Sequence, residues 1–352
     1  MLGIELRTQS LQLSRSVHNS RQRWDERRST CLALVQGDWV GRGEATPLPG
    51  FSLESHQSAH HELMQLDPRE LTNDIAGLSA PQLLDRAHAR CDTASARFAL
   101  ECALLDLHAK RHSVSRLSIL HELTHDRFTS KPPDTSSVRH DAESLQPAQL
   151  LDIGALPAPP RVLPGCYKLK LGAALQNELR MLRDWQPQLT NDVQLRFDFN
   201  RSVNPAELQA VLEHLAELHP QFVEELCAVE DLGPPRSLPV TIAFDESLLG
   251  AEPGSQRAQL IEAWIAATPV VLVVKPMLLG GIKPLQRWAD SSARALVVSH
   301  LFDGSIAAGM YDDLAKVFGS PGLAMGLGTH PGLQLWQSEP NDAEPRLVGG
   351  TR

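Results

Sequence analysis

The chain has 352 residues, 33 of them basic and 42 acidic, so its formal net charge is −9. This length suffices for one large domain or two, and the acidic balance argues against a nucleic-acid partner. The first residues, MLGIELRTQS, lack the apolar core of a signal peptide, and the most apolar run, 265–274, is too short to span a bilayer. Five cysteines without CxxC spacing are typical of reduced thiols. We therefore expect a cytoplasmic protein without a membrane partner.

The spacing of apolar residues changes once within the N-terminal part of the sequence. Polar and apolar residues alternate over the first fifty positions, which predicts antiparallel strands. Helical spacing follows from about 54 to 125 and is strongest in TASARFALECALLDLHAKR. These patterns predict an α+β domain over residues 1–135. The polar, proline-containing stretch 126–142 predicts a linker.

After the linker, short apolar strands alternate with helices. The predicted strands include CYKLKL, VQLRFDFN, FVEELCAVED, VTIAFDES, VVLVVKP, ALVVSHLF and GLAMGLG. The first strand is poorly marked, and SLQPAQLLDIG is our candidate for it. Repeated βα units predict a parallel sheet enclosed by helices, and their number favours a (β/α)8-type barrel over residues 136–334. Periodicity alone leaves an open doubly wound sheet as the alternative.

Charged side chains collect where these strands end. They are Lys168 and Lys170, then Arg196, Asp198 and Asn200, then Glu230, then Asp245 and Glu246, then Lys275. A single acid in such a place is more often a helix cap or a solvated loop residue. In a parallel barrel, however, the carboxyl ends of all strands meet at one mouth, so a series of charged ends predicts a site there.

The residue types at this mouth indicate a particular chemistry. Asp198, Glu230 and Asp245 on neighbouring strands would need a counter-ion, and their hard oxygens suit Mg²⁺. A lysine acts as a base only when part of it is neutral near pH 7. Desolvation, the ammonium of Lys168 and a divalent cation would all lower the pKa of Lys170. Mg²⁺ facing an amine base suits proton abstraction next to a carboxylate.

The order lysine, acid, acid, acid, lysine, with KLK at 168–170 and the lysine of VVKP, resembles the enolase superfamily and its muconate-lactonizing-enzyme subgroup. The stretches GRGEATPLPGFSLES and ARFALECALLDLHAK resemble the capping domain of that subgroup. The resemblance implies a modified TIM barrel whose N-terminal α+β capping domain is completed by the C-terminal tail, residues 335–352.

Within the subgroup, LRFDFNRS, IAFDESL, VVKPMLLGG, ALVVSHLFDGSIAAG and GLGTHPGL most resemble the o-succinylbenzoate synthase family. The implied reaction is the Mg²⁺-dependent syn-dehydration of 2-succinyl-6-hydroxy-2,4-cyclohexadiene-1-carboxylate in menaquinone biosynthesis, with Mn²⁺ as a possible substitute. The implied metal ligands are Asp198, Glu230 and Asp245. Lys170 would be the base and then the acid for the leaving hydroxide. Lys275 would stabilise the enediolate, and Lys168 would tune Lys170 and help to hold the carboxylate.

The resemblance also implies supporting residues. Arg196, Asn200 and Glu246 would support the metal ligands, and Ser299 and the backbone near Gly328 would hold the succinyl tail of the substrate. Two features depart from the family pattern. Only 15 residues separate Glu230 from Asp245, so the helix between them must be very short or missing, and in SHLFDGS a glycine follows the expected acid, Asp303.

Four other functions compare with this one. N-acylamino acid racemases use the same two lysines as opposed bases, and motifs do not separate them from the dehydratases. A dipeptide epimerase is disfavoured because GLAMGLG lacks an acidic pair. HELTH at 121–125 fits the zinc-protease motif H-E-x-x-H, but no third ligand follows, and we interpret it as a surface helix end. A non-catalytic barrel is disfavoured because all five key positions are intact. The oligomeric state is not indicated.

Overall fold

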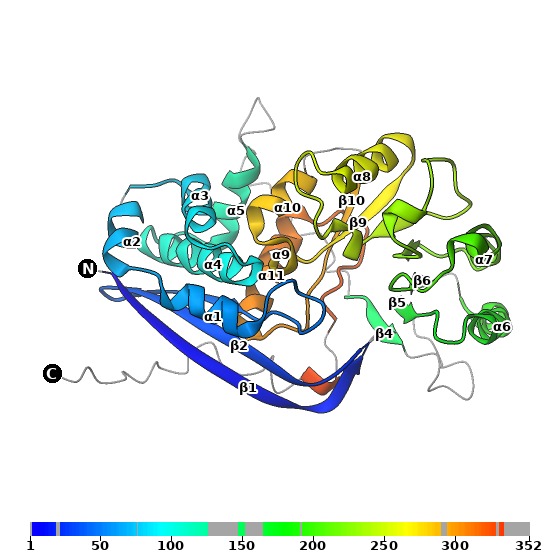
Figure 1. Cartoon of the computed structure of the whole chain (residues 1–352), viewed down its shortest axis with the longest axis horizontal. Coiled ribbons are helices and arrows are strands. Elements are labelled where there is room, and N and C mark those ends of the chain that lie inside the picture. The colour runs from blue at the N-terminus through cyan, green and yellow to red at the C-terminus, as the bar shows by residue number, and fades with distance from the viewer. Residues whose placement is uncertain are drawn as a thin grey trace.

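The computed structural model describes residues 2–18, 22–75, 77–125, 147–151, 165–190, 192–289, 294–328 and 331–333. Within them lie a three-stranded antiparallel sheet and a seven-stranded parallel sheet, each covered by helices (Figure 1). The predicted linker, the predicted domain boundary at 135–136 and the C-terminal tail 335–352 fall outside the described residues.

The capping domain is built on the antiparallel sheet, with strand order β1-β2-β3. Its strands are β1 (Gly3–His18), β2 (Arg23–Gln36) and β3 (Trp39–Ala45). Five helices follow: α1 (His56–Met64), α2 (Pro68–Ile75), α3 (Ala80–Arg90), α4 (Ala94–Arg111) and α5 (Arg116–His125). Figure 1 shows the long β1–β2 ribbon curving beneath these helices. The predicted α+β arrangement is confirmed.

Helix α4 packs directly on the backbone of β3, which explains two glycines in that strand. A Cβ at Gly41 would lie 2.1 Å from the carbonyl oxygen of Ala103, and one at Gly43 would lie 1.8 Å from that of Ala99. Helix α4 is buried on nearly all sides, so it forms the centre of the capping domain.

The second sheet is parallel, with order β10-β9-β8-β7-β6-β5-β4. Its strands are β4 (Gln149–Leu151), β5 (Gly165–Lys170), β6 (Val193–Asp198), β7 (Phe222–Glu224), β8 (Ile242–Phe244), β9 (Val270–Val274) and β10 (Arg294–Val298). The helices among them are α6 (Leu175–Trp185), α7 (Leu208–Ala216), α8 (Gln256–Ala267), α9 (Pro276–Leu279), α10 (Ile282–Ala289) and α11 (Ser305–Phe318). Between β7 and β8 lies only the 3-10 helix η4 (Val229–Asp231) instead of an α-helix, as the short spacing predicts.

The two edges of the parallel sheet are joined by the predicted last strand. The amide of Gly326 donates to the carbonyl of Val298 at the end of β10 (2.8 Å), and Ser299 bridges Gly326 in parallel. On the other side, the amide of Ala148, next to β4, donates to the carbonyl of Met325 (3.0 Å). We call residues 324–328 the closing segment. It confirms the predicted barrel-type architecture, with β4 in the stretch proposed for the first strand.

Alternation along the strands divides their side chains between two apolar layers. One set faces the helices and belongs to the main core, for example Phe197, Leu272 and Val298. The other set forms a separate cluster inside the barrel: Phe222, Ala243, Val271, Val273 and Val297. Because side chains alternate, the residues two positions beyond this second set also point inward at the strand ends. This parity brings polar residues to one mouth.

Two glutamates of the capping domain lie at the first turns of barrel helices. Glu101 of α4 accepts from the amide of Ile282 at the start of α10 and from His88 Nε2 (2.9 Å). Glu44 of β3 accepts from the amide of Ala307 in the first turn of α11 (3.1 Å). A carboxylate stabilises unpaired amides and the positive end of a helix dipole, so these contacts hold the two domains together.

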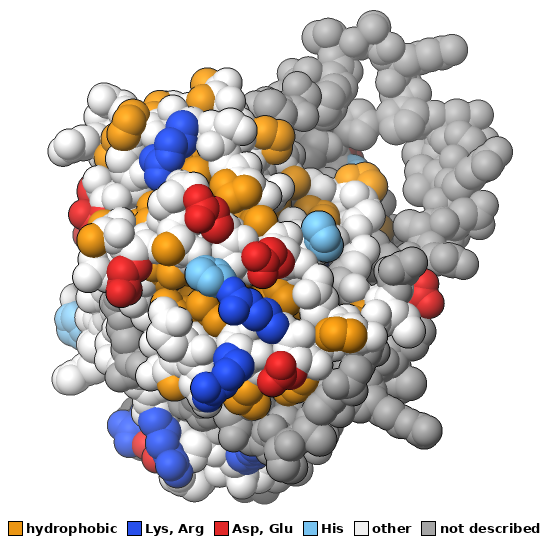
Figure 2. Space-filling view, turned by 90° about the vertical axis from the view of Figure 1, so that its right-hand side faces the viewer, with side chains coloured by type: hydrophobic (Ala, Val, Ile, Leu, Met, Phe, Trp, Pro, Cys, Tyr) orange, Lys and Arg blue, Asp and Glu red, His pale blue; other side chains and the backbone are white. Residues whose placement is uncertain are grey.

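One face of the molecule shows how charged side chains are distributed over the described surface. On the face that lies at the right of Figure 1, acidic and basic side chains of the described residues are interspersed rather than gathered by sign (Figure 2). In the part of the chain that the structure describes, no helix has both the length and the hydropathy that crossing a membrane requires.

Candidate active site

Strand register brings most of the predicted charged residues together. Lys168 pairs with Arg196 and Lys170 with Asp198 across β5 and β6, and Asp198 in turn lies opposite Glu224 of β7. All of these residues except Lys168 and Lys170, which are half-buried, are nearly inaccessible to solvent. The result is a polar layer at the carboxyl ends of the strands, above the apolar interior of the barrel.

Lys168 binds two carboxylates. Its Nζ lies 2.8 Å from Glu224 Oε1 and 2.9 Å from Asp198 Oδ2. Burial acts to lower the pKa of Lys168, but the charges of Asp198 and Glu224 outweigh burial and raise it. Lys168 therefore stays positively charged and ties the ends of β6 and β7 together.

Lys170 lies two residues beyond Lys168 on the same face of β5, but its environment differs from that of Lys168. Burial lowers the pKa of Lys170; Asp198 opposes this effect, and the ammonium groups of Lys168 and Lys275 lower the pKa further. Its one described hydrogen bond is long, 3.5 Å from Nζ to Asn200 Oδ1. Lys168 acts on Lys170 with the sign expected from the sequence, although burial is the larger cause.

Lys275 stands at the end of β9, four strands from Lys170 in the sheet order. It forms a buried ion pair with Asp245, and its Nζ lies 5.1 Å from the centre of the Phe51 ring. Burial acts to lower the pKa of Lys275, and Asp245 outweighs burial and raises it. Of the three lysines at the mouth, Lys170 thus has a lowered pKa, whereas Lys168 and Lys275 have raised ones.

The structure corrects one predicted metal ligand. Strand β7 ends at Glu224, not at Glu230, because only Phe222–Glu224 pair with the neighbouring strands. Glu230 lies beyond the strand on η4, where its carboxylate accepts from Arg257 Nε (2.6 Å) and its side chain is 37% exposed. The prediction that Glu230 joins Asp198 and Asp245 is therefore wrong, and Glu224 takes that place.

The carboxylates fit a hard divalent cation by their chemistry. Asp198, Glu224 and Asp245 are buried, end three successive strands and each contact a lysine. Burial raises the pKa of Asp245, which Lys275 offsets only in part, and its Oδ1 has no hydrogen-bond partner among the described residues. As they are placed, no three acidic, histidine or cysteine side chains among the described residues form a ready cation cage. The lysines supply the positive charge next to these acids.

Asn200 and Glu246 lie in this layer, and their predicted role in supporting metal ligands stays a prediction. Asn200, at a positive φ of 43°, donates from Nδ2 to Glu246 Oε1 (2.8 Å) and from its amide to Asp198 Oδ1 (3.1 Å). Arg196 lies deeper in the barrel, where its Nε donates to Gln221 Oε1 (2.7 Å) and its guanidinium covers the Phe222 ring at 4.5 Å. Asn200 therefore links Lys170, Asp198 and Glu246.

Sequence reasoning missed Glu225. Its Oε1 accepts from the amides of Asp245 and Ser247, both at 2.7 Å, and its Oε2 accepts from Arg201 Nε at 2.8 Å. Burial and the charge of Glu246 raise the pKa of Glu225 to about 7, with Arg201 opposing. Glu225 thus fixes the turn that carries Asp245. The adjacent acids in FVEELC, directly after an apolar run, were the signal for both Glu224 and Glu225.

Ser299 and Gly328 lie at the closing segment. Ser299 Oγ donates to the carbonyl of Gly326 (3.1 Å), and His300 Nε2 lies 3.1 Å from the carbonyl oxygen of Gly328. A Cβ at Gly328 would lie 2.4 Å from the carbonyl oxygen of Ala148, so only glycine fits there. Their role in binding a succinyl tail stays a prediction.

The capping domain adds an apolar wall that the sequence did not reveal. Phe51, Trp24 and Leu48 pack with barrel residues in a cluster separate from the main core. The barrel side of this cluster consists of Leu249, Leu278, Leu301 and Phe302, and Leu333 also belongs to the cluster. These residues come from segments that are far apart in the sequence, so no local pattern could group them.

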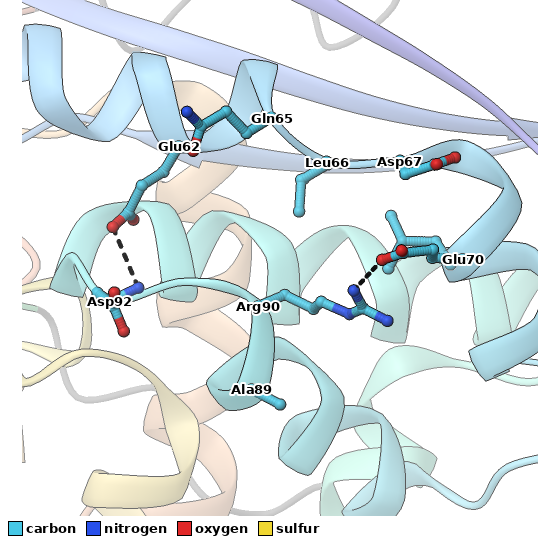
Figure 3. Close-up of a pocket in the computed structure, with 9 residues that line it drawn as sticks. Glu62, Gln65, Leu66, Asp67, Glu70, Ala89, Arg90 and Asp92 are labelled. Carbon is cyan, nitrogen blue, oxygen red and sulfur yellow. Dashed lines mark hydrogen bonds and ion pairs between the residues drawn. The ribbon is translucent and has the colours of Figure 1, made fainter.

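Two other candidate sites lie away from the mouth. HELTH ends α5 on the capping domain; the side chain of His125 is outside the described residues, and no triad of potential metal ligands was found in the described part. A groove of about 280 Å³ lies between helices of the capping domain (Figure 3). Its acids are engaged within the fold: Glu62 accepts from the amide of Asp92 (3.2 Å), and Glu70 pairs with Arg90.

Two family models match the sequence. One, described as mandelate racemase / muconate lactonizing enzyme, N-terminal domain, covers residues 4–120, and the other, enolase C-terminal domain-like, covers residues 165–346. Among curated proteins, the chain is 27% identical over 319 residues to the o-succinylbenzoate synthase of Salmonella arizonae, covering 88% of this chain and 85% of that protein. It is 25% identical over 322 residues to the o-succinylbenzoate synthase of Pasteurella multocida, covering 88% and 84%.

Solved structures share the fold. The muconate lactonizing enzyme of Pseudomonas fluorescens, complexed with muconolactone, matches with a TM-score of 0.72 at 19% identity, covering 96% of this chain and 89% of that one. A dipeptide epimerase of Methylococcus capsulatus, complexed with Mg and a dipeptide, gives 0.69 at 24%, covering 90% and 87%. MenC of Desulfotalea psychrophila gives 0.64 at 18%, covering 94% of each chain.

Proposed function

The chain belongs to the enolase superfamily, and on that premise we propose that it is a lyase with o-succinylbenzoate synthase activity. The proposed substrate is a small carboxylate, 2-succinyl-6-hydroxy-2,4-cyclohexadiene-1-carboxylate, which loses water to give 2-succinylbenzoate. The curated relatives named for this activity support the proposal, since they align over 88% of the chain. The observation that carries it is geometric: Lys170 ends β5 and Lys275 follows β9 at the same mouth, and the buried carboxylates of Asp198, Glu224 and Asp245 lie at the ends of the strands between them.

A dehydration by one base needs this division of labour. Lys170, neutral in part, takes the proton from the carbon next to the substrate carboxylate and holds it on Nζ. The same ammonium then gives that proton to the hydroxyl that leaves from the same face, so one water is released and Lys170 returns to its starting state. Lys170 lies at the end of β5, at the mouth where the substrate would bind.

Lys275 has the complementary task. Its ammonium, after β9 and four strands from Lys170 in the sheet order, would stabilise the negative charge that develops on the substrate. Asp198, Glu224 and Asp245 are the residues that would hold Mg²⁺, or Mn²⁺ in its place. When bound, the cation supplies positive charge next to the substrate carboxylate. Lys168 keeps Asp198 and Glu224 in position through its two ion pairs.

The racemase alternative asks something different of Lys275. Proton exchange at one carbon needs two lysines that can each lose a proton, one on either side of the substrate. The curated relatives named o-succinylbenzoate synthase support the dehydratase over the racemase. Both reactions require Lys170, so variants of Lys170 do not separate them.

The deciding experiment assays the purified protein with Mg²⁺ against the cyclohexadiene carboxylate and, in parallel, against N-succinyl amino acids. We expect dehydration, seen as formation of the aromatic product, with a kcat/KM far above that for racemisation. Lys170→Ala should remove turnover, because general acid–base catalysis typically contributes about 10²- to 10⁴-fold. Racemisation without dehydration would replace the proposal with the alternative, and an active Lys170→Ala enzyme would refute the mechanism.

A further inference from the structure

Arg27 is a fully buried arginine that no catalytic role explains. It comes from β2 of the capping domain, and its side chain has 0% exposure to solvent. Burying a guanidinium is costly unless its donors are satisfied. The partners of Arg27 therefore indicate what its burial achieves.

Those partners belong to two loops that flank the mouth. Nη2 donates to the carbonyl of Thr46 (2.8 Å) and Nη1 to that of Pro47 (3.1 Å), in the loop 46–51 that follows β3. Nη2 also donates to the carbonyl of Leu301 and Nε to that of Phe302, both at 3.1 Å, in the loop 299–304 that follows β10. One planar side chain thus joins a capping-domain loop to a barrel loop.

Neighbouring contacts strengthen the same junction. Trp24, three residues before Arg27, donates from Nε1 to the carbonyl of Pro49 (2.9 Å), and its ring lies 6.4 Å from that of Phe302. Asp303 lies 3.6 Å from Arg27 Nη2 and accepts from the amide of Leu301 (2.9 Å) and from Tyr311 (2.8 Å). The barrel loop is therefore shaped to receive the guanidinium.

Both loops carry residues that face the site. Loop 46–51 ends with Phe51, whose ring lies 5.1 Å from Lys275 Nζ. Loop 299–304 begins with Ser299 and His300, which bind the carbonyls of Gly326 and Gly328 in the closing segment. A shift of either loop would change the space between Phe51 and the closing segment.

We propose that Arg27 is a positioning residue that clamps loop 46–51 to loop 299–304 and thereby sets the substrate specificity of the mouth. The kinetic part of this inference rests on the proposed function, while its structural part does not. The clamp depends on the planar fork of arginine, which reaches four carbonyl oxygens together; a lysine keeps the charge but cannot do so.

The structural part is tested by hydrogen exchange on the protein without substrate. In Arg27→Met, amides of both loops should exchange faster together, because Leu48, Phe51, Leu301 and Phe302 all donate hydrogen bonds within these loops. Arg27→Lys should behave like Arg27→Met if the fork matters, and like the wild type if only the charge matters. If Arg27→Met does not fold, the comparison of Arg27→Lys with the wild type still tests the clamp.

Arg116→Met is the matched control. Arg116 also joins the capping domain to the barrel, through Asp313 (3.0 Å) and the carbonyl of Gly309 (3.1 Å), but it contacts α11 rather than the mouth. We expect it to leave exchange in the two loops unchanged. Equal loop exchange in wild type and both Arg27 variants, or the same change in Arg116→Met, would overturn the clamp.

The kinetic part uses the same proteins. With the cyclohexadiene carboxylate, Arg27→Lys should raise KM by about tenfold, the loss expected when charge-assisted hydrogen bonds are broken, while kcat changes far less. Arg116→Met should leave KM as in the wild type. If Arg27→Lys loses kcat and stability while its KM stays as in the wild type, Arg27 is merely structural and the specificity proposal is overturned. If the wild type does not act on this substrate, the proposed function fails and the exchange data still decide the clamp.

Discussion

Lys168 and Lys170 differ in neighbours more than in burial, and their pKa values move in opposite directions. Two carboxylates contact Lys168, whereas Lys170 meets only the amide oxygen of Asn200 among the described contacts. At the scale of single residues, the difference between the two lysines therefore depends on which of them contacts the carboxylates. Alternation along β5 predicts that both lysines share a face, but it does not predict this division.

The pH profile should report the difference. Because the base must be unprotonated, kcat/KM should rise with pH through the lowered pKa of Lys170, reaching its plateau below the range of an ordinary lysine. Lys168→Met removes a neighbouring ammonium, so the rise should move to higher pH. Lys168→Arg keeps the charge and should leave the midpoint in place. An unmoved midpoint in Lys168→Met would mean that Lys168 does not tune the base.

The corrected carboxylate gives a paired comparison. Glu224→Gln removes one charge from the buried set of acids and should weaken Mg²⁺ binding by more than about tenfold, with a matching loss of activity. Glu230→Gln removes only an exposed ion pair with Arg257, worth at most about 1 kcal/mol, and should leave both unchanged. Calorimetric titration with Mg²⁺ measures the binding. Equal losses in the two variants would contradict the correction.

At the scale of elements, a site residue could be predicted from the sequence only where the end of its strand was clear. An apolar residue of the strand stands directly before each of Lys170, Asp198, Asp245 and Lys275, and the sequence placed these four residues correctly at strand ends. The stretch FVEELCAVED has acids at both ends, and pairing stops after three residues because η4 follows. Hydrogen-bonded pairing between strands, which fixes that end, is not visible in a single sequence.

Helix-to-sheet contact in the capping domain has its own test. Gly43→Ala would place a Cβ 1.8 Å from the carbonyl oxygen of Ala99, so α4 or β3 must shift, at a cost of about 1–3 kcal/mol or more. Gly37→Ala is the control, since nothing lies within 4 Å of its Cβ and only its φ of 60° opposes the change. Chemical denaturation measures both. A smaller loss for Gly43→Ala than for Gly37→Ala would show that α4 does not rest on that strand.

At the scale of the whole molecule, contacts between the two domains shape the mouth. The sequence indicated both domains, and the fold agrees, but the apolar wall with Phe51 and the clamp at Arg27 could not be foreseen. Arg27 and Phe302 are separated by 275 positions, and no periodic pattern relates them. Such contacts depend on how complete domains pack, which a residue-by-residue reading does not reach.

Docking of the domains should depend on pH through Glu44. Burial raises its pKa from 4.5 to about 7, with the amide of Ala307 opposing. A folded-state pKa above the unfolded value means that this stability is fully present below pH 4.5 and is lost as pH rises through 7. The stability of Glu44→Gln relative to the wild type should therefore increase as pH rises from 5 to 8, by at most about 3 kcal/mol in the free energy of unfolding.

Denaturation of both proteins across that range measures the effect. The other buried acids, including Glu225, are common to the two proteins and cancel in the difference. A constant difference between wild type and Glu44→Gln at all pH values would show that Glu44 does not titrate on unfolding in this range.

Glu44 and Glu101 also bear on domain exchange among related enzymes. Each provides, from the capping domain, the acceptor for a first-turn amide of a barrel helix, α11 or α10. A chimera that keeps this barrel and takes its capping domain from a relative must therefore supply side-chain acceptor oxygens, from Glu or Gln, at both places. Without them the hybrid would leave two helix starts buried and unsatisfied, whatever residues its mouth contains.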